Sequence, residues 1–380
     1  MSVVQECEPI RELRRIRSVT PVVVGVDPAI DWLIVQVEDR EGNVGLGEGT
    51  LERHNTAVSS VVFDAGSALV GRDPRREVAR RAPVPGSMVE AAAHSALNQA
   101  LWDLTARQNR VPLAIMRAGH KARAPRLYAN LNRAIGPDRS PASFAAAARS
   151  AKAQGFQVVK IAPFDGVERR PMSDPTTRRF VTEGLNRTAA VLEVSDVEVR
   201  VDLHWRFELS AAVQVVHELS RLKVGWIEAP VREGALAEWT AIRARTEARL
   251  AGGETLTRPR EFAAFLDASG VDVVMPDIKY CGGVDGFREV LEIAERYGAA
   301  VAPHNPSGPV ATLATVHAAA GHRLDSLEIP WRSQPNAVDV IENGQLELPS
   351  GGGLGLRLAD GLAARFPARP EPDHAPTDLI

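Results

Sequence analysis

The stretch V-E-V-R-V-D-L-H-W-R-F, residues 197–207, decides how this chain folds. It predicts a short buried strand that ends in polar residues at Asp202 and His204. Two later apolar runs end in the same way, at Glu228 and at Glu254, and the three acidic residues follow one another at intervals of 26 residues. That interval is about the size of one strand-plus-helix unit. Carboxylates at the C-terminal ends of three successive parallel strands converge, so the pattern predicts a site for a hard cation.

Eight apolar runs of this kind alternate with helical patterns over residues 125–329. Eight is the number of strands in a closed (β/α)8 barrel, whose functional residues lie at the C-terminal ends of the strands. The predicted strands are 127–131, 158–161, 197–201, 224–227, 250–253, 271–275, 299–302 and 326–329. The predicted helices are 143–154, 177–192, 209–222, 236–246, 258–268, 284–297 and 310–320. The polar residues that end strands two to eight are Lys160, Asp202 with His204, Glu228, Glu254, Asp277, His304 and Glu328. Each alone could be a solvated loop residue, but seven strand ends in register indicate a site.

The predicted fold class is therefore α/β, a (β/α)8 TIM-type barrel with an N-terminal α+β capping domain that the C-terminal tail completes. The cap is expected to consist of a three-stranded antiparallel meander over 16–26, 31–38 and 44–48, followed by helices over 56–69 and 88–107. The expected division is a capping domain over residues 1–124, a barrel over 125–332 and a returning segment over 333–380.

The composition excludes several classes of function. A formal charge of −3 over 380 residues gives no electrostatic reason to expect nucleic acid or an anionic membrane as a partner. The two cysteines, Cys7 and Cys281, have neither metal-ligand spacing nor the pattern of a disulfide framework, which favours a reducing compartment. The N-terminus has no signal-peptide pattern, and no apolar run approaches the roughly 20 residues that span a bilayer. A soluble cytoplasmic protein is expected.

The three carboxylates also predict which cation binds. An all-oxygen site favours Mg²⁺, with Mn²⁺ second, over zinc, which prefers nitrogen and sulfur ligands. Such a cation holds a substrate carboxylate and neutralises the negative charge that develops when the adjacent carbon loses a proton. The product of that proton loss is an ene-diolate.

Motifs along nearly the whole chain resemble one known family. They are, in order, G-L-G-E-G, S-A-L-N-Q-A-L-W-D-L, G-F-Q-V-V-K, V-D-L-H, W-I-E-A-P, G-G-E-T, M-P-D-I-K-Y-C-G-G, A-P-H-N-P-S-G-P and G-G-G-L-G-L. In this order they resemble the enolase superfamily, in its mandelate racemase/muconate lactonizing enzyme-like group, and more narrowly the acid-sugar dehydratases of the galactonate dehydratase type. The resemblance also implies a homo-oligomer, as an octamer or a dimer.

The resemblance assigns roles to the residues at the strand ends. Asp202, Glu228 and Glu254 match the Mg²⁺ ligands of the family. His304 matches the base, and Asp277 matches the partner that orients the base and raises its basicity. The resemblance thus implies proton abstraction from a carbon held next to the cation.

Further residues match family positions, and some of these positions differ between branches of the family. Glu328 matches the carboxyl group that hydrogen-bonds the substrate carboxylate, and His204 matches the acid that protonates a departing hydroxide in dehydratases with D-x-H. His204 could also be a structural hydrogen-bonding residue. Racemases carry K-x-K on the second strand, whereas this chain has Lys160 but Ala162 in the second place. Lys160 either acts on the substrate or pairs with a neighbouring carboxylate.

Other polar residues carry weaker expectations. A cycloisomerase lysine would lie where this chain has Tyr280, and Lys279, one residue away, is expected to turn to the other face. Arg53 and His54 lie in the loop after the meander, which in the family lids the barrel mouth and contacts the far end of the substrate; they could equally be ordinary loop residues. His317 falls in a helical pattern and is expected to be a surface or packing residue.

The predicted function is Mg²⁺-dependent dehydration of a sugar acid, an aldonate or related polyhydroxy carboxylate, to a 2-keto-3-deoxy acid. One alternative is a racemase or epimerase, with His304 on one face of the substrate and Lys160 or His204 on the other. Another is a non-catalytic paralogue that binds a sugar acid. The expected partner is a small-molecule sugar acid, and the racemase or epimerase alternative would act on a 2-hydroxy acid.

Overall fold

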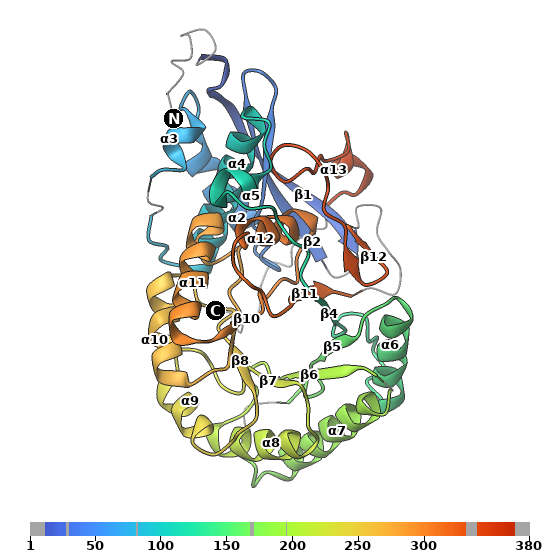
Figure 1. Cartoon of the computed structure of the whole chain (residues 1–380). Helices are drawn as coiled ribbons and strands as arrows, with labels where there is room; N and C mark the ends of the chain where they lie inside the picture. Colours follow the sequence, from blue (N-terminus) through green and yellow to red (C-terminus); the bar gives the residue numbers. More distant parts are fainter. Residues whose placement is uncertain are drawn as a thin grey trace.

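The computed structural model describes residues 12–27, 30–80, 83–167, 171–194, 196–331 and 340–368. The outer parts of the predicted segments 1–124 and 333–380 therefore lie outside the described residues. A barrel of strands ringed by helices forms one part of the molecule, and a sheet with its own helices lies over one end of it (Figure 1). No helix in the described ranges is long and apolar enough to cross a membrane.

The cap contains an antiparallel sheet in the order β1-β2-β3. Its strands are Ile16–Asp27, Ile30–Asp39 and Val44–Glu48. The helices beside it are α2 (Asn55–Ser67), α3 (Pro74–Glu77), α4 (Met88–Gln108) and α5 (Leu113–Ala118). Strand β3 lies directly against α4. The approach is so close that a Cβ atom added at Gly47 would lie 1.9 Å from the carbonyl oxygen of Ala96. The two glycines of β3, Gly45 and Gly47, thus allow a sheet-to-helix approach that larger residues would block.

The barrel has eight strands in the order β10-β9-β8-β7-β6-β5-β4-β11, and all the pairs are parallel. They are β4 (Leu127–Asn130), β5 (Val158–Ile161), β6 (Glu198–Asp202), β7 (Trp226–Glu228), β8 (Leu250–Gly252), β9 (Val273–Val274), β10 (Ala300–Val301) and β11 (Leu327–Pro330). The last strand pairs with the first, and a backbone hydrogen bond of 2.8 Å from Asp325 to Val301 connects the remaining pair. The predicted barrel is confirmed.

Helices cover the outside of the barrel (Figure 1). They are α6 (Pro141–Ala153), α7 (Pro175–Leu192), α8 (Leu209–Arg221), α9 (Leu236–Arg243), α10 (Pro259–Ser269), α11 (Gly283–Tyr297) and α12 (Pro309–Ala318). Helix α6 begins where Ser140 accepts a hydrogen bond from the backbone of Ser143, and α7 begins where Asp174 accepts one from Thr176. A proline at the first turn of each helix fits this start, because the first backbone N–H groups of a helix have no partner within it.

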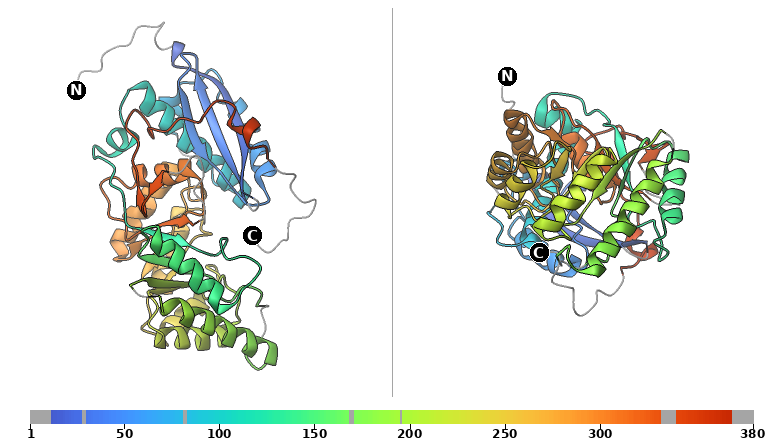
Figure 2. Two further views of the ribbon diagram at one scale, coloured as in Figure 1. Left: turned by 90° about the vertical axis from the view of Figure 1, so that its right-hand side faces the viewer. Right: turned by 90° about the horizontal axis from the view of Figure 1, so that it is seen from below.

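The C-terminal segment runs back to the cap. It contains β12 (Ile341–Glu342), β13 (Gln345–Leu346) and α13 (Leu362–Arg365). The backbone of Leu354 donates a hydrogen bond of 2.7 Å to the buried Asp103 of α4, and the backbone of Gly25 donates one of 3.0 Å to Phe366. Figure 2 shows this segment, in red, along the blue sheet of the cap.

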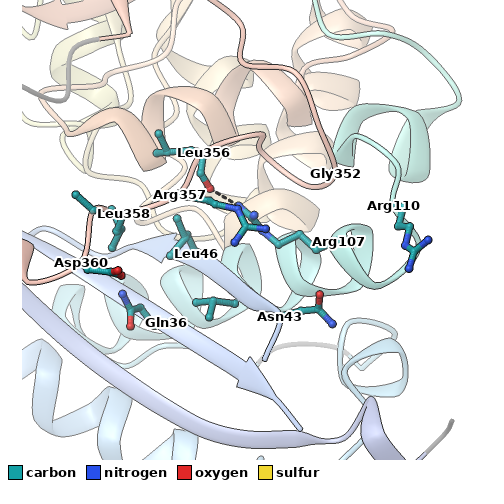
Figure 3. Close-up of a pocket in the computed structure, with 12 residues that line it drawn as sticks. Gln36, Asn43, Leu46, Arg107, Arg110, Gly352, Leu356, Arg357, Leu358 and Asp360 are labelled. Atoms are coloured by element: carbon teal, nitrogen blue, oxygen red, sulfur yellow. Dashed lines mark hydrogen bonds between the residues drawn. The ribbon is translucent and has the colours of Figure 1, made fainter. Parts of the chain in front are cut away.

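A cavity of about 750 Å³ lies between this segment and the cap (Figure 3). Residues of β2, β3, the end of α4 and the returning segment line it, and Arg107 points into it. None of the site residues predicted from the sequence is among its lining residues. The polar residues predicted at the strand ends therefore do not line this cavity.

Candidate functional site

The structure brings three carboxylates together at the C-terminal ends of neighbouring strands. Asp202 and Glu228 are paired across β6 and β7, and Glu254 follows β8 after Gly253, whose φ is +108°. One oxygen from each carboxylate lies within 4.8 Å of the others. Asp202 and Glu228 are buried, at 2% and 0% exposure. This group is an all-oxygen donor set of the kind that holds Mg²⁺.

The backbone beside these carboxylates is strained. His204 and Trp205 each have a φ of +45°, and Ala229, directly after Glu228, has a φ of +44°. Residues with a side chain rarely adopt this left-handed region, and such strain is often found at functional sites. Here it turns the chain sharply at the ends of β6 and β7, where the side chains of Asp202 and Glu228 enter the site.

Lys160, at the end of β5, lies among the carboxylates. Its Nζ is 2.6 Å from Glu228, 3.0 Å from Glu328 and 3.6 Å from Asp202, and the side chain is 1% exposed. The alternative in which Lys160 pairs with a barrel carboxylate thus describes its surroundings in this structure. The single positive charge of Lys160 cannot balance three ionised carboxylates.

Burial and mutual repulsion govern the protonation of this group. Burial, followed by repulsion from Asp202, raises the pKa of Glu228 well above its ordinary value. Burial opposes the charge of Asp202 as well, but His204 and Lys160 outweigh it and lower the pKa of Asp202. The carboxylates therefore have a deficit of positive charge that a divalent cation would remove.

Glu328 of β11 is buried and accepts hydrogen bonds from several directions. Asn130 donates to it at 2.5 Å, the backbone of Asn305 at 3.2 Å and Tyr128 at 3.4 Å, in addition to Lys160. Burial alone would raise the pKa of Glu328, but Lys160, His304 and Asn130 lower it. The predicted hydrogen bond from Glu328 to a substrate carboxylate consequently requires a proton on one of the two groups.

His304 and Asp277 form a hydrogen-bonded pair in the loops that follow β10 and β9. His304 Nδ1 lies 2.8 Å from Asp277 Oδ2, and Nε2 lies 3.3 Å from Glu254. Burial lowers the pKa of His304, but Glu254 and Asp277 outweigh it and the pKa is raised. An ionised Asp277 only accepts hydrogen bonds, so when the ring of His304 is neutral its proton lies on Nδ1 and Nε2 can accept a proton.

Lys279 lies close to this pair and is buried, with 1% of its side chain exposed. Its Nζ donates to Asp277 Oδ2 at 2.6 Å and to Ser307 at 2.5 Å. The alternation rule does not apply, because β9 ends at Val274 and Lys279 lies in a turn. The position expected for a cycloisomerase lysine holds Tyr280, whose hydroxyl donates to the backbone of Thr50 at 3.0 Å.

His204 lies between two carboxylates. Its Nε2 is 3.0 Å from Asp202 and its Nδ1 is 3.4 Å from Asp165, which follows β5. Burial opposes a charge on the ring, but Asp202 and Asp165 outweigh it and raise the pKa of His204 well above its ordinary value. Arg139 holds Asp165 in turn, at 3.1 Å. The arrangement favours a protonated His204, the state that a general acid needs.

Arg53 and His54 lie in the loop between β3 and α2. Within the described ranges neither forms a hydrogen bond or ion pair with the carboxylate group, and Arg53 is 3.9 Å from its neighbour Glu52. The loop does contact the barrel, because Arg133 after β4 donates to Glu52 at 2.7 Å. The structure places the loop beside the barrel end but assigns no partner in the site to either residue.

Several supporting residues were not predicted from the sequence. Tyr128 and Asn130 alternate along the predicted strand 127–131, so their common face could have been inferred. The indole of Trp226 donates to Glu228 at 3.2 Å, although the sequence indicates only a core residue there. Asn305 and Asp165 lie in loops, where sequence spacing does not predict side-chain direction.

Two family models match this chain. Residues 143–362 match "Enolase C-terminal domain-like", and residues 12–116 match "Mandelate racemase / muconate lactonizing enzyme, N-terminal domain". The chain belongs to the enolase superfamily, in the mandelate racemase/muconate lactonizing enzyme family. The sequence-based prediction of this family, of an enzyme and of a capped (β/α)8 fold is confirmed.

The chain is also similar to characterised relatives and solved structures. The D-gluconate dehydratase of Thermoproteus tenax is 28% identical over 355 residues, which cover 89% of this chain and 70% of the relative. The D-galactonate dehydratase of Verminephrobacter eiseniae is 30% identical over 294 residues, which cover 75% and 74%. A mandelate racemase/muconate lactonizing enzyme-like protein from Rubrobacter xylanophilus has a TM-score of 0.81 at 26% identity, covering 93% of this chain and 98% of that one.

Proposed function

We propose that this protein dehydrates a sugar acid to a 2-keto-3-deoxy acid in a Mg²⁺-dependent reaction. The observation that carries the proposal is that two histidines contact the same cluster of three carboxylates. His304 Nε2 lies 3.3 Å from Glu254, and His204 Nε2 lies 3.0 Å from Asp202. Dehydration next to a carboxylate needs one base and one acid, and the two histidines supply one ring for each task. The relatives named as D-gluconate and D-galactonate dehydratases support the substrate class.

Asp202, Glu228 and Glu254 would hold the cation. The donor chemistry fits Mg²⁺, since three carboxylates converge, and burial together with repulsion from Asp202 raises the pKa of Glu228. A bound Mg²⁺ would supply positive charge beside the substrate carboxylate and so favour loss of the neighbouring proton.

His304 would take the α-proton of the substrate at Nε2. Asp277 holds the other ring nitrogen at 2.8 Å and thereby keeps Nε2 free to accept. The resulting negative charge would lie near Lys160, which together with Glu328 is placed at the ends of β5 and β11. Glu328 would contact the substrate carboxylate only when one of the two groups carries a proton.

His204 would act in the second step, by protonating the β-hydroxyl group as it departs. Asp202 and Asp165 favour its protonated form. Hydroxide is a poor leaving group, and general-acid assistance typically contributes about 10²–10⁴ in rate. Arg53 and His54 are proposed to contact the far end of the substrate from the loop beside the barrel.

The test divides the reaction between the two histidines. His304→Asn should abolish both keto-acid formation and α-proton exchange with deuterated water, because no base remains. His204→Asn should slow dehydration by about 10²–10⁴ while α-proton exchange survives. Exposed His217→Asn on α8 serves as the matched control. If exchange vanishes without His204 and persists without His304, the roles are reversed, and wild-type dehydration rates in both variants would overturn the mechanism.

Racemisation is a weaker proposal for this site. It needs a base on the second face of the substrate, and the position that would hold a second lysine is the buried Ala162. Lys160 is the remaining lysine of that strand, and its Nζ already contacts three carboxylates. The domain limits at residues 124 and 332, the homo-oligomeric state and the cytoplasmic location stay predictions.

A further inference from the structure

Asp277 needs a cation, because its carboxylate is fully buried. Its exposure is 0%, and burial alone would raise its pKa. A buried carboxylate without a charged partner takes up a proton instead of remaining ionised. When His304 is neutral, as a base must be, it supplies a hydrogen bond but no full positive charge.

Lys279 is the cation on this carboxylate. Its backbone N–H donates to Asp277 Oδ1 at 2.8 Å, and its Nζ donates to Asp277 Oδ2 at 2.6 Å. The same Oδ2 accepts the hydrogen bond from His304 Nδ1 at 2.8 Å. Attraction to Lys279 is the largest influence that lowers the pKa of Asp277 against burial. Lysine and histidine thus share one carboxylate oxygen.

Lys279 also connects the two loops that carry the pair. Its Nζ donates to Ser307, three residues after His304, at 2.5 Å. The side chain of Lys279 is 1% exposed, so it does not open to the site where a substrate would lie. It can therefore act on a substrate only through other residues.

The remaining carboxylate that attracts Lys279 is already satisfied. Glu48 of β3 accepts hydrogen bonds from the backbone of Gly308 at 2.7 Å and of Ala311 at 2.9 Å, at the start of α12, and from Thr50 at 2.9 Å. Glu48 thus stabilises the contact between the cap and the barrel. Within the described part of the chain, Lys279 forms its ion pair with Asp277, at 2.6 Å.

We propose that Lys279 is a positioning residue that sets the tautomer of His304: its ammonium group keeps Asp277 ionised, and ionised Asp277 keeps the ring proton on Nδ1. Without Lys279, Asp277 would bind a proton and donate it in a hydrogen bond to Nδ1. The ring would then carry its own proton on Nε2, the nitrogen that must be free to accept the substrate proton. This inference rests on the proposed role of His304 as the base.

The direct test is the tautomer itself. Nitrogen-15 NMR of histidine-labelled protein distinguishes Nδ1–H from Nε2–H rings, and His304→Asn identifies the His304 signals among the 9 histidines. The wild type should show the Nδ1–H form and Lys279→Met the Nε2–H form, with Mg²⁺ present and at one pH at which the ring is neutral in both proteins. Exposed Lys121→Met is the control and should match the wild type. An Nδ1–H ring in Lys279→Met would overturn the proposal.

Kinetics give a second test, made on whichever sugar acid the wild type turns over. Lys279→Met should lower kcat for α-proton exchange by about 10² or more while KM changes little, because a wrong tautomer removes the base without touching the substrate. Lys279→Met combined with Asp277→Asn should be no slower than Asp277→Asn alone. Full multiplication of the two losses would mean that Lys279 does not act through Asp277.

The double variant also guards against a failure to fold. The double variant leaves no unpaired buried charge, so it should be more stable than Lys279→Met alone. It should fold even if the single variant does not, and if both fold it should have the higher denaturant midpoint. A double variant that is less stable than the single one contradicts the pairing. If no sugar acid is turned over by the wild type, the proposed function fails, and the NMR measurement still decides the role of Lys279.

Discussion

Replacement of Lys160 with methionine should destabilise the protein without metal and increase its response to Mg²⁺. Lys160 Nζ lies 2.6, 3.0 and 3.6 Å from oxygens of Glu228, Glu328 and Asp202. At an effective dielectric constant of about 20, unit charges roughly 3 Å apart attract by about 5–6 kcal/mol. The cost of removing water from the buried lysine offsets much of this attraction. Loss of one partner from a buried charged group typically costs about 3–5 kcal/mol, and we expect that range here.

The same carboxylates are the proposed Mg²⁺ ligands, so the lysine and the cation should oppose each other. A ligand that binds the folded state at 100 times its Kd stabilises it by about 2.7 kcal/mol. Lys160→Met removes a positive charge from beside the ion, so Mg²⁺ should bind the variant more tightly. The stabilisation by a fixed Mg²⁺ concentration should therefore be larger in Lys160→Met than in the wild type.

The assay is urea unfolding in EDTA and in Mg²⁺, with Lys152→Met as the matched control. Lys152 forms a surface ion pair with Asp196 at 3.5 Å, with side-chain exposures of 39% and 89%. Such pairs contribute about 0–1 kcal/mol, so the control should unfold like the wild type under both conditions. The reasoning is refuted if Lys160→Met is as stable as the wild type in EDTA, or if Mg²⁺ stabilises both proteins equally.

Three further outcomes are expected. Glu228→Gln should weaken Mg²⁺ binding, measured by calorimetry, while the circular dichroism spectrum is retained; unchanged affinity would remove Glu228 from the ligand set. Ala162→Lys should introduce α-proton exchange at the second face of the substrate, detected by NMR, and efficient racemisation by the wild type would contradict this role of Ala162. Burial lowers the pKa of His317 to about 4 from 6.5, and its Nδ1 accepts a hydrogen bond from Ala114 at 3.2 Å. The unfolded chain therefore binds a proton here between pH 6.5 and about 4 while the folded chain does not, so up to about 3 kcal/mol of stability is lost as pH falls through that range. His317→Asn should remove this part of the pH dependence in urea unfolding, and identical pH profiles would exclude it.

Much of the fold follows from local sequence. Strand β3 of the cap and strand β5 of the barrel have the bounds that the sequence predicts. The other barrel strands differ from prediction by at most two residues at either end. The reason is physical, since strands buried on both faces must be apolar, and the chain becomes polar where they end. Equal intervals between strand ends then place Asp202, Glu228 and Glu254 on neighbouring strands. The returning hairpin of β12 and β13 is less predictable, because it is too short for a periodic pattern.

The direction of a side chain was predictable only where a strand fixes it. Lys160 ends a strand, and its position at the barrel end follows from the sequence. Lys279 lies beyond β9, in a turn whose side-chain directions depend on the loop after β10. Its contact with Asp277 therefore needs the three-dimensional structure. The same applies to Asp165, which reaches His204 from a different loop.

The two buried lysines divide the charges of the site into two groups. Lys160 contacts Asp202 and Glu228, two of the proposed metal ligands, and so faces the same carboxylates as the cation. Lys279 contacts Asp277, which lies outside the ligand set and behind the proposed base. A substrate entering beside the metal would therefore change the charge around the first lysine but leave the second ion pair in place. His304 contacts both groups, through Glu254 on one nitrogen and Asp277 on the other. With the proposed roles, this separation would let the charge at the cation change during a reaction while the tautomer of the base stays fixed.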